Sequence, residues 1–263
     1  MQAVTGVFAS HDKADHAIRT LLSNGVPADK ITFLTPGHHH ALAEPVPADA
    51  GEQLGMGKAI GAIIGAAGGI TGGSLLAAAI MPGVGPVTAV GLLGAAILGV
   101  AGAGVGAEAG GSLENSLTEG LPEDEIFVYE DALRKGRSVV IALPDNADAA
   151  EPLRTLMKSE GAESVDAARH QWWIGLRSAE REHYAAAGRD FDGHEIFYRR
   201  GFEDALHARH RCKEFDQVSA EMESNLEDLQ KQYPDMDVSE AYASGFRRGR
   251  EYYQRLCEEK KAA

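Results

Sequence analysis

The sequence predicts an α+β fold: a small sandwich of strands and helices, split by an inserted helical hairpin and followed by a helical tail. Three observations predict it. β-Prone segments alternate with amphipathic segments on both sides of residues 54–112. No charged side chain lies between Lys58 and Glu108. From Ser178 onward the chain is polar, charged and helical in period. The expected domain boundaries are 1–36 and 113–168 for the two halves of the sandwich, 37–53 for a linker, 54–112 for the hairpin and 169–263 for the tail.

The first half of the sandwich is predicted as strand, helix, strand. Residues 3–8 alternate and are β-prone, and residues 30–35 form a second such segment. Between them, residues 11–23 carry apolar side chains at helical spacing. Ser10 is suited to cap the start of this helix, and Asn24-Gly25 to end it.

The second half adds helix, strand, helix, strand. Helices are predicted from Pro122 to about residue 135 and over 147–159, and strands over 138–143 and 164–167. Without the hairpin, the order is close to a ferredoxin-like βαββαβ sandwich with an insertion after its second strand. Both halves of one sheet must lie on the same side of any membrane, so the insertion must cross an even number of times.

The uncharged insertion carries small residues at a spacing of four. Four residues make about one helical turn, so each row forms a stripe without side chains along one helix face. Such stripes let helix backbones approach closely, as in the small-xxx-small packing of membrane helices. Residues 82–86 (PGVGP) predict the tip between two helical arms. The expected helix-packing residues are Gly57, Gly61, Gly65, Gly69, Gly73, Gly91, Gly99, Gly102, Gly106 and Gly110.

Two environments for this hairpin remain open. Arms of about 20 uncharged residues are long enough to cross a hydrocarbon core of about 30 Å, which favours a membrane anchor. Ala and Gly gain little from transfer into lipid, which favours a hairpin buried in a soluble oligomer. The first 15 residues, MQAVTGVFASHDKAD, do not have the pattern of a signal peptide. We therefore expect a homo-oligomer at the cytoplasmic face of the inner membrane, in contact with lipid, or alternatively in the cytoplasm.

Composition excludes some classes of function. The formal net charge of −14 argues against a nucleic-acid partner, which needs a basic surface, and against a polybasic membrane anchor. The two cysteines, Cys212 and Cys257, form no CxxC motif and imply no disulfide framework.

Three segments resemble a known family. VTGVFASHDKADHAIRTLLSNGVPADKITFLT at residues 4–35 resembles the N-terminal domain of the bacterial heat-induced or general stress proteins. IMPGVGPVTAVG at residues 80–91 and LPEDEIFVYEDALRKGRSVVIAL at residues 121–143 resemble the longer, glycine-rich members of that family. The resemblance covers residues 2–145 and implies a role in stress, with no catalytic or binding residue carried over. The long C-terminal tail departs from the shortest members.

The tail contains an internal repeat. YRRGF at residues 198–202 recurs as YASGF at residues 242–246, and each lies in an aromatic, arginine-containing helix. We expect these two helices, joined by a helix over 213–232, to pack on each other or on a protein partner through a small residue flanked by aromatic ones. The expected contact residues are Tyr198, Gly201, Phe202, Tyr242, Gly245 and Phe246. Trp172-Trp173 is predicted either to pack the tail on the sandwich or to anchor it at a membrane interface.

The tail also holds the candidates for metal chemistry. In a continuous helix His207 and His210 would share one face, with Cys212 nearby, but this set closes no ligand shell. Glu180 and His183 form a single ExxH pair, whereas di-iron carboxylate sites need two. The adjacent histidines 38–40 also form no closed shell.

No motif predicts catalysis. GK[ST], GxSxG and HExxH are all absent, so no enzyme and no cofactor are expected. One basic cluster is interleaved with Glu251, Glu258 and Glu259 and predicts a solvated helix, with contact to anionic lipid or RNA as the alternative; it comprises Arg247, Arg248, Arg250, Lys260 and Lys261. The sequence favours a non-enzymatic, stress-associated scaffold anchored by an oligomerising glycine-zipper hairpin. The alternatives are a soluble oligomeric binding module, whose hairpin forms an assembly core or an apolar-ligand chamber and whose tail docks a partner, and a metal- or haem-dependent redox protein.

Overall fold

The computed structural model describes residues 3–37, 76–81, 84–91, 93–94, 97, 123–211 and 213–262. The chain is α+β and divides into two compact units. The sheet unit comprises Met1–Pro122 and Tyr129–Ala168, and the helical unit comprises Glu123–Val128 and Arg169–Ala263.

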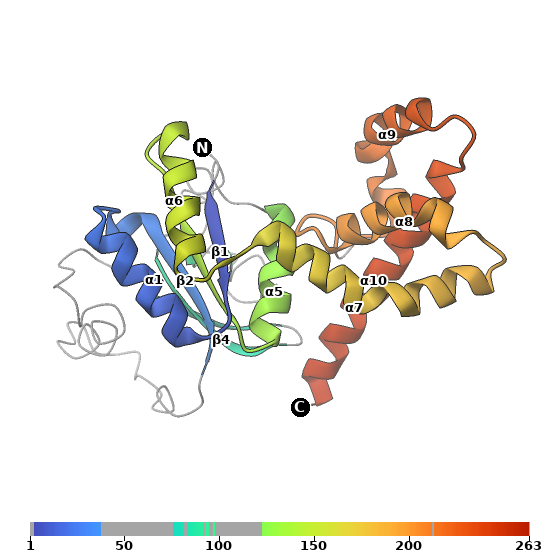
Figure 1. Cartoon of the computed structure of the whole chain (residues 1–263). Coiled ribbons are helices and arrows are strands. Elements are labelled where there is room, and N and C mark those ends of the chain that lie inside the picture. Colours follow the sequence, from blue (N-terminus) through green and yellow to red (C-terminus); the bar gives the residue numbers. More distant parts are fainter. Residues whose placement is uncertain are drawn as a thin grey trace. The chain divides into compact units, whose positions relative to one another are not determined.

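The sheet unit is built on an antiparallel sheet in the strand order β3-β4-β2-β5-β1-β6 (Figure 1). The strands are β1 (Val4–Phe8), β2 (Ile31–Pro36), β3 (Leu76–Met81), β4 (Gly85–Val90), β5 (Ser138–Ala142) and β6 (Glu163–Ser164). In β5, Val140 lies opposite Gly6 of β1 on one side and Phe33 of β2 on the other. Strands from both predicted halves therefore share one sheet.

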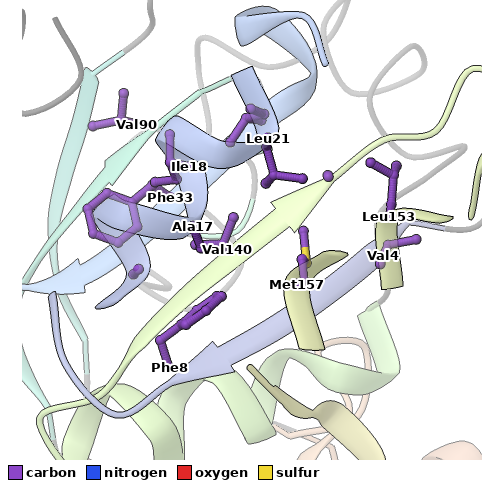
Figure 2. Packing of buried hydrophobic residues seen from close by; sticks show 13 residues of the cluster. Val4, Phe8, Ala17, Ile18, Leu21, Phe33, Val90, Val140, Leu153 and Met157 are labelled. Carbon is purple, nitrogen blue, oxygen red and sulfur yellow. The ribbon is translucent and has the colours of Figure 1, made fainter. Parts of the chain in front are cut away.

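Two helices close a hydrophobic core against one face of this sheet. They are α1 (His11–Ser23) and α6 (Ala147–Ser159), which also contact each other. Figure 2 shows their apolar side chains pointing at those of β1, β2 and β5. Burial of each large apolar side chain contributes about 1.5–3 kcal/mol. The buried residues of this cluster include Phe8, Ile18, Leu21, Phe33, Leu153 and Met157.

Both core helices begin at a side-chain cap. Ser10 accepts a hydrogen bond from the backbone N of Lys13 at 3.4 Å, and Asn146 accepts one from Ala149 N at 2.9 Å. The helix α1 ends at Asn24, and Gly25 follows with φ +86°. The predicted helices over 11–23 and 147–159 are confirmed, as are the predicted strands over 3–8, 30–35 and 138–143. The predicted helix over 122–135 corresponds to a 3-10 turn, Glu123–Glu125, and α5 (Ile126–Arg134).

The predicted last strand is shorter than expected. It ends at Ser164, and the helix α7 (Val165–Ala186) begins at the next residue. The Ser164 hydroxyl accepts a hydrogen bond from Ala167 N at 3.2 Å, and Asp166 lies in the first helical turn. A capping hydroxyl and an early acidic residue favour helix over strand, so the strand prediction for 165–167 is wrong.

The predicted helical hairpin is wrong for its central part. Residues 76–81 and 85–90 are the strands β3 and β4, and β4 pairs with β2 through Thr88 opposite Thr35. At the predicted tip Val84 N donates to Met81 O at 3.2 Å, and the segments before and after it are strands, not helices. Val87, Thr88 and Val90 are β-branched, and the edge of β2 offers their backbone a ladder of hydrogen bonds.

Gly91 is not a helix-packing residue either. It lies in a bend after β4 with φ +109°, and a Cβ there would overlap the carbonyl oxygen of Ile31. This glycine is needed for a left-handed bend packed against β2. The other expected helix-packing residues, Gly57, Gly61, Gly65, Gly69, Gly73, Gly99, Gly102, Gly106 and Gly110, lie outside the described residues.

The position of β3 and β4 also changes the predicted topology. Both strands belong to the same sheet as β2 and β5, so residues 76–81 and 85–90 lie on the same side of any membrane as the rest of the sheet. A tip at residues 82–86 on the far side of a membrane is therefore wrong. Among the residues that the structure describes, no helix is both long and apolar enough to cross a membrane.

The helical unit contains the rest of α7 followed by α8 (Phe191–Leu206), α9 (Phe215–Gln232) and α10 (Val238–Ala262) (Figure 1). The most extensive contact in this unit is between α8 and α10, and α9 also packs on α10. Asp237 caps α10 by accepting a hydrogen bond from Glu240 N at 3.1 Å. The connecting helix predicted over 213–232 is confirmed as α9.

Both tryptophans of α7 lie in the core of the helical unit. Trp172 packs on Phe127 with ring centroids 4.9 Å apart, and Trp172 and Trp173 each lie 5.8 Å from Phe202 of α8. The indole N–H of Trp173 donates to Glu195 at 2.8 Å. Because both rings are buried, an exposed interfacial anchor is wrong for these residues.

Candidate functional site

The helices α8 and α10 approach each other closely where they cross. A Cβ on Gly201 would overlap the carbonyl oxygen of Tyr242, and a Cβ on Gly245 would overlap that of Tyr198. A Cβ on Gly249 would overlap the carbonyl oxygen of Phe202. Only glycine fits at these three points, so the crossing depends on the absence of their side chains.

The two helices run in the same direction through this crossing. Gly201 lies against Tyr242 and Phe246, whereas Gly249, further along α10, lies against Phe202 and Ala205, further along α8. The structure thus places the tail residues that the repeat singles out at one crossing. This is small-residue packing of the kind that the sequence predicts for the insertion, found here in a different part of the chain.

A buried ion pair lies beside the crossing. Glu180 of α7 has only 3% of its side chain exposed, and Arg248 of α10 has 14%. Arg248 Nε lies 3.0 Å from Glu180 Oε2, and Nη2 lies 2.9 Å from Oε1. The hydroxyl of Tyr198 donates to Glu180 Oε2 at 2.7 Å. The carboxylate is therefore held on both oxygens by α8 and α10 together.

The electrostatics of this cluster keep its charges in place. Burial, and then the hydrogen bond to Glu180, raise the pKa of Tyr198, so its hydroxyl stays protonated. The hydrogen bond to Glu180 raises the pKa of Arg248, because the carboxylate favours the charged guanidinium. Buried pairs of this kind are costly to break, since either partner alone would leave an uncompensated charge.

A second buried tyrosine has a different environment. The hydroxyl of Tyr242 donates to Asp204 Oδ2 at 2.5 Å and lies 2.6 Å from the sulfur of Met222 on α9. Burial, followed by the charge of Asp204, raises the pKa of Tyr242.

Sequence reasoning missed these buried polar groups. The ExxH spacing of Glu180 and His183 does not indicate that Glu180 pairs with Arg248. The prediction of a solvated helix is wrong for Arg248, whose side chain is only 14% exposed and is bonded to Glu180. A pattern was available for Glu180: it occupies the apolar stripe of α7, seven residues after Trp173 and four before Tyr184, both of which are buried. No local pattern identifies Arg248 as its partner.

The candidate metal ligands are not arranged as expected. The helix α8 ends at Leu206, and His207 is its C-cap, so His207 and His210 do not share the face of a continuous helix. The Nδ1 of His210 lies 3.0 Å from the carbonyl oxygen of Asp204. Cys212 lies outside the described residues. In the described ranges, no group of three or more His, Cys, Asp or Glu side chains could hold a metal ion.

One open pocket of about 290 Å³ lies in the sheet unit at the start of α1. His11 Nδ1 lies 3.4 Å from the hydroxyl of Thr35, and Ser138 Oγ lies 3.2 Å from the same hydroxyl. Of the polar groups that line this pocket, His11 and Thr35 thus contact each other. Its lining residues are Ser10, His11, Asp12, Thr35, Pro36 and Gly136.

Comparison with protein-family models, with curated proteins and with solved structures gave no match to this chain. Inferences about its function therefore start from the contacts described above.

Proposed function

We propose that the chain is a non-enzymatic, stress-associated scaffold. Its sheet unit carries a glycine-rich segment that attaches it to the membrane surface and to other copies of the chain, and its helical unit docks a protein partner. The stress association rests on the resemblance of residues 4–35, 80–91 and 121–143 to the heat-induced or general stress proteins.

The observation that carries this proposal is that the buried groups Glu180, Tyr198 and Tyr242 are each bonded to side chains of neighbouring helices. Both oxygens of Glu180 are bonded by Arg248 and Tyr198, and the Tyr242 hydroxyl is bonded to Asp204. A general acid or base needs a proton or lone pair within reach of a substrate. These groups instead hold helices together, which is the role expected of a rigid binding module.

A ferredoxin-like sandwich is the architecture that we propose for the sheet unit. The order β2-β5-β1-β6, with α1 and α6 as connections and every pair antiparallel, supports it. In this proposal β3 and β4 extend the sheet beyond β2, and the glycine-rich segments flank that extension.

The position of β3 and β4 in the sheet supports attachment to a membrane surface over passage through the membrane, because the two strands divide the uncharged run into two shorter stretches. The uncharged residues 59–75 precede β3, and residues 92–107 follow β4. Each stretch leaves the sheet unit and must return to it, and two crossings need roughly 40 apolar residues. Neither stretch is that long. The spacing of Gly61, Gly65 and Gly69 supports contacts between copies of the chain.

The second candidate is a soluble oligomeric binding module in the cytoplasm. It is favoured by the burial of Val87, Ala89, Leu93 and Ile97, which belong to the second predicted arm and are covered by protein. In this alternative the remaining glycine-rich residues form an assembly core.

Membrane fractionation with a carbonate wash, followed by detergent, separates the two candidates. The scaffold proposal expects the protein to sediment with membranes and to be released by detergent as an oligomer. Recovery in the high-speed supernatant, as a particle whose size does not depend on detergent, would exclude membrane attachment and leave the soluble module.

A further inference from the structure

The contacts between α8 and α10 are reciprocal. Residues 198–202 and 242–246 carry the same YxxGF pattern, 44 positions apart. Gly201 lies against the carbonyl oxygen of Tyr242, and Gly245 lies against the carbonyl oxygen of Tyr198. Moving Gly201 forward by 44 positions gives Gly245, and moving Tyr242 back by 44 gives Tyr198, so the second contact is the first with the two helices exchanged. Such reciprocity is the property of an isologous interface between two identical subunits.

The same reciprocity extends to the preceding helices. On α7, Trp173 lies 5.8 Å from Phe202 and 6.5 Å from Tyr198. On α9, Phe215 lies 5.5 Å from Phe246 and 6.1 Å from Tyr242. Trp173 therefore contacts the Tyr and Phe of the α8 repeat in the same way as Phe215 contacts those of the α10 repeat. The two aromatic residues are 42 positions apart, whereas the repeats are 44 apart.

The tyrosine hydroxyls complete the correspondence. Tyr198 bonds Glu180, seven residues after Trp173, and Tyr242 lies against Met222, seven residues after Phe215. From the opposite helix, Arg248 approaches the first site through Glu180, and Asp204 binds the second tyrosine directly. Positions 204 and 248 are again 44 apart.

We propose that α7–α8 and α9–α10 are two copies of one αα-hairpin, and that the YxxGF face of each is a docking surface whose partner is another copy of that hairpin. The inference does not depend on the proposed function. In the two copies of the hairpin, Glu180 of the first corresponds to Met222 of the second, and Asp204 of the first corresponds to Arg248 of the second.

The two copies differ in charge, and the difference decides which hairpins pair. In the pair formed within one chain, the positive Arg248 meets the negative Glu180, and the negative Asp204 accepts a hydrogen bond from Tyr242. A pair of α9–α10 hairpins from two chains would bring Arg248 over Met222, and a pair of α7–α8 hairpins would bring Asp204 over Glu180. The first would leave Arg248 with only the exposed Glu251 as its counter-charge, and the second would bury Glu180 beside another carboxylate, which disfavours pairs of like hairpins between chains.

The test is made in the full-length protein. It changes the group Glu180–Tyr198–Arg248, the first site, into a copy of the group Met222–Tyr242–Asp204, the second site. Arg248→Asp is made in the wild-type background and in a Glu180→Met background, and the thermal midpoint of the helical unit is measured. With Glu180 present, Arg248→Asp buries two carboxylates together and lowers the midpoint. With Glu180→Met, the new carboxylate meets Tyr198 as Asp204 meets Tyr242, so Arg248→Asp raises the midpoint relative to Glu180→Met alone.

This reversal of sign supports the equivalence of the two hairpins. A lower midpoint, or loss of folding, for Arg248→Asp in both backgrounds would overturn it. The reverse experiment tests the second site. Asp204→Arg by itself is expected to lower the thermal midpoint, and the addition of Met222→Glu is expected to restore it. Charge reversal at the exposed pair Arg154 and Glu151, which are 50% and 76% exposed, is the control and leaves the midpoint unchanged.

Discussion

Arg248 binds both carboxylate oxygens of Glu180 across 68 residues of sequence, while its other terminal nitrogen, Nη1, lies 2.6 Å from Glu251. The two acidic partners differ in environment. Glu180 has 3% of its side chain exposed, whereas Glu251 has 54%. One arginine thus makes a buried and an exposed ion pair, and the two can be compared directly.

Replacing the buried partner should destabilise the helical unit far more than replacing the exposed one. Glu180→Gln keeps the shape of the side chain but removes the buried counter-charge of the Arg248 guanidinium, at an expected cost of about 3–5 kcal/mol. The matched control Glu251→Gln should cost less than about 1 kcal/mol, because water screens that pair. Urea unfolding monitored by the fluorescence of Trp172 and Trp173 measures both. Equal effects would contradict the assignment of Glu180 as the structural partner.

Stability should decline at alkaline pH because two buried tyrosines must stay protonated. The pKa values of Tyr198 and Tyr242 are raised in the folded state by burial and by their acidic neighbours. Above the unfolded value of about 10, the unfolded chain loses these protons and the folded chain keeps them, so stability is full below pH 10 and falls as pH rises beyond it.

The urea midpoint between pH 8 and pH 11.5 measures this decline. The control is the double variant Tyr198→Phe, Tyr242→Phe, whose stability should fall less steeply above pH 10 because neither site can ionise in the unfolded chain. Parallel profiles for the two proteins would show that these hydroxyls do not titrate on unfolding.

The glycine crossing should not tolerate a methyl group. Gly245→Ala places a Cβ against the carbonyl oxygen of Tyr198, and the overpacking should cost about 1–3 kcal/mol. Gly175 of α7 has no atom within 4 Å of an added Cβ, so Gly175→Ala should instead stabilise the helix by up to about 1 kcal/mol. Thermal unfolding compares the pair of variants. A stabilising Gly245→Ala would mean that α8 and α10 do not approach as closely as described.

Assembly should depend on the glycine row before β3. Gly65→Leu raises helix propensity by up to about 1 kcal/mol but puts a large side chain into the stripe, at a cost of about 1–3 kcal/mol for each contact. A smaller or heterogeneous particle is expected for Gly65→Leu and an unchanged one for Ile63→Leu. Light scattering and native mass, with and without detergent, measure the size. If Gly65→Leu leaves both size and thermal stability unchanged, the spacing of these glycines is incidental.

Predictions from sequence succeeded where a rule acts over a few residues. The cap at Ser10, the stop at Asn24-Gly25 and the apolar spacing between them define α1 by local hydrogen bonds and one helix face. The repeated YxxGF pattern likewise pointed to Gly201 and Gly245, since a small residue flanked by aromatics has few other uses in a helix.

The failures came where two local solutions were close in free energy. An uncharged run rich in Ala, Gly and Val suits either a packed helix or a strand, and residues 76–81 and 85–90 are strands because the edge of β2 supplies a partner for β4. The same applies to residues 165–167, where a capping hydroxyl from Ser164 favours helix over strand.

The sequence by itself determined the α+β class, the caps, and the core helices and strands of the sheet unit, because each depends on neighbours within a few residues. The internal repeat also pointed to Gly201 and Gly245, whereas Gly249 became evident as a third contact only in the structure. Only the tertiary structure decided the strand pairing of residues 76–90 and the partnership of Glu180 with Arg248. Both outcomes depend on contacts between groups that are far apart in the sequence and that meet only when the chain folds. A buried carboxylate needs a partner, but the spacing along the chain does not say which one.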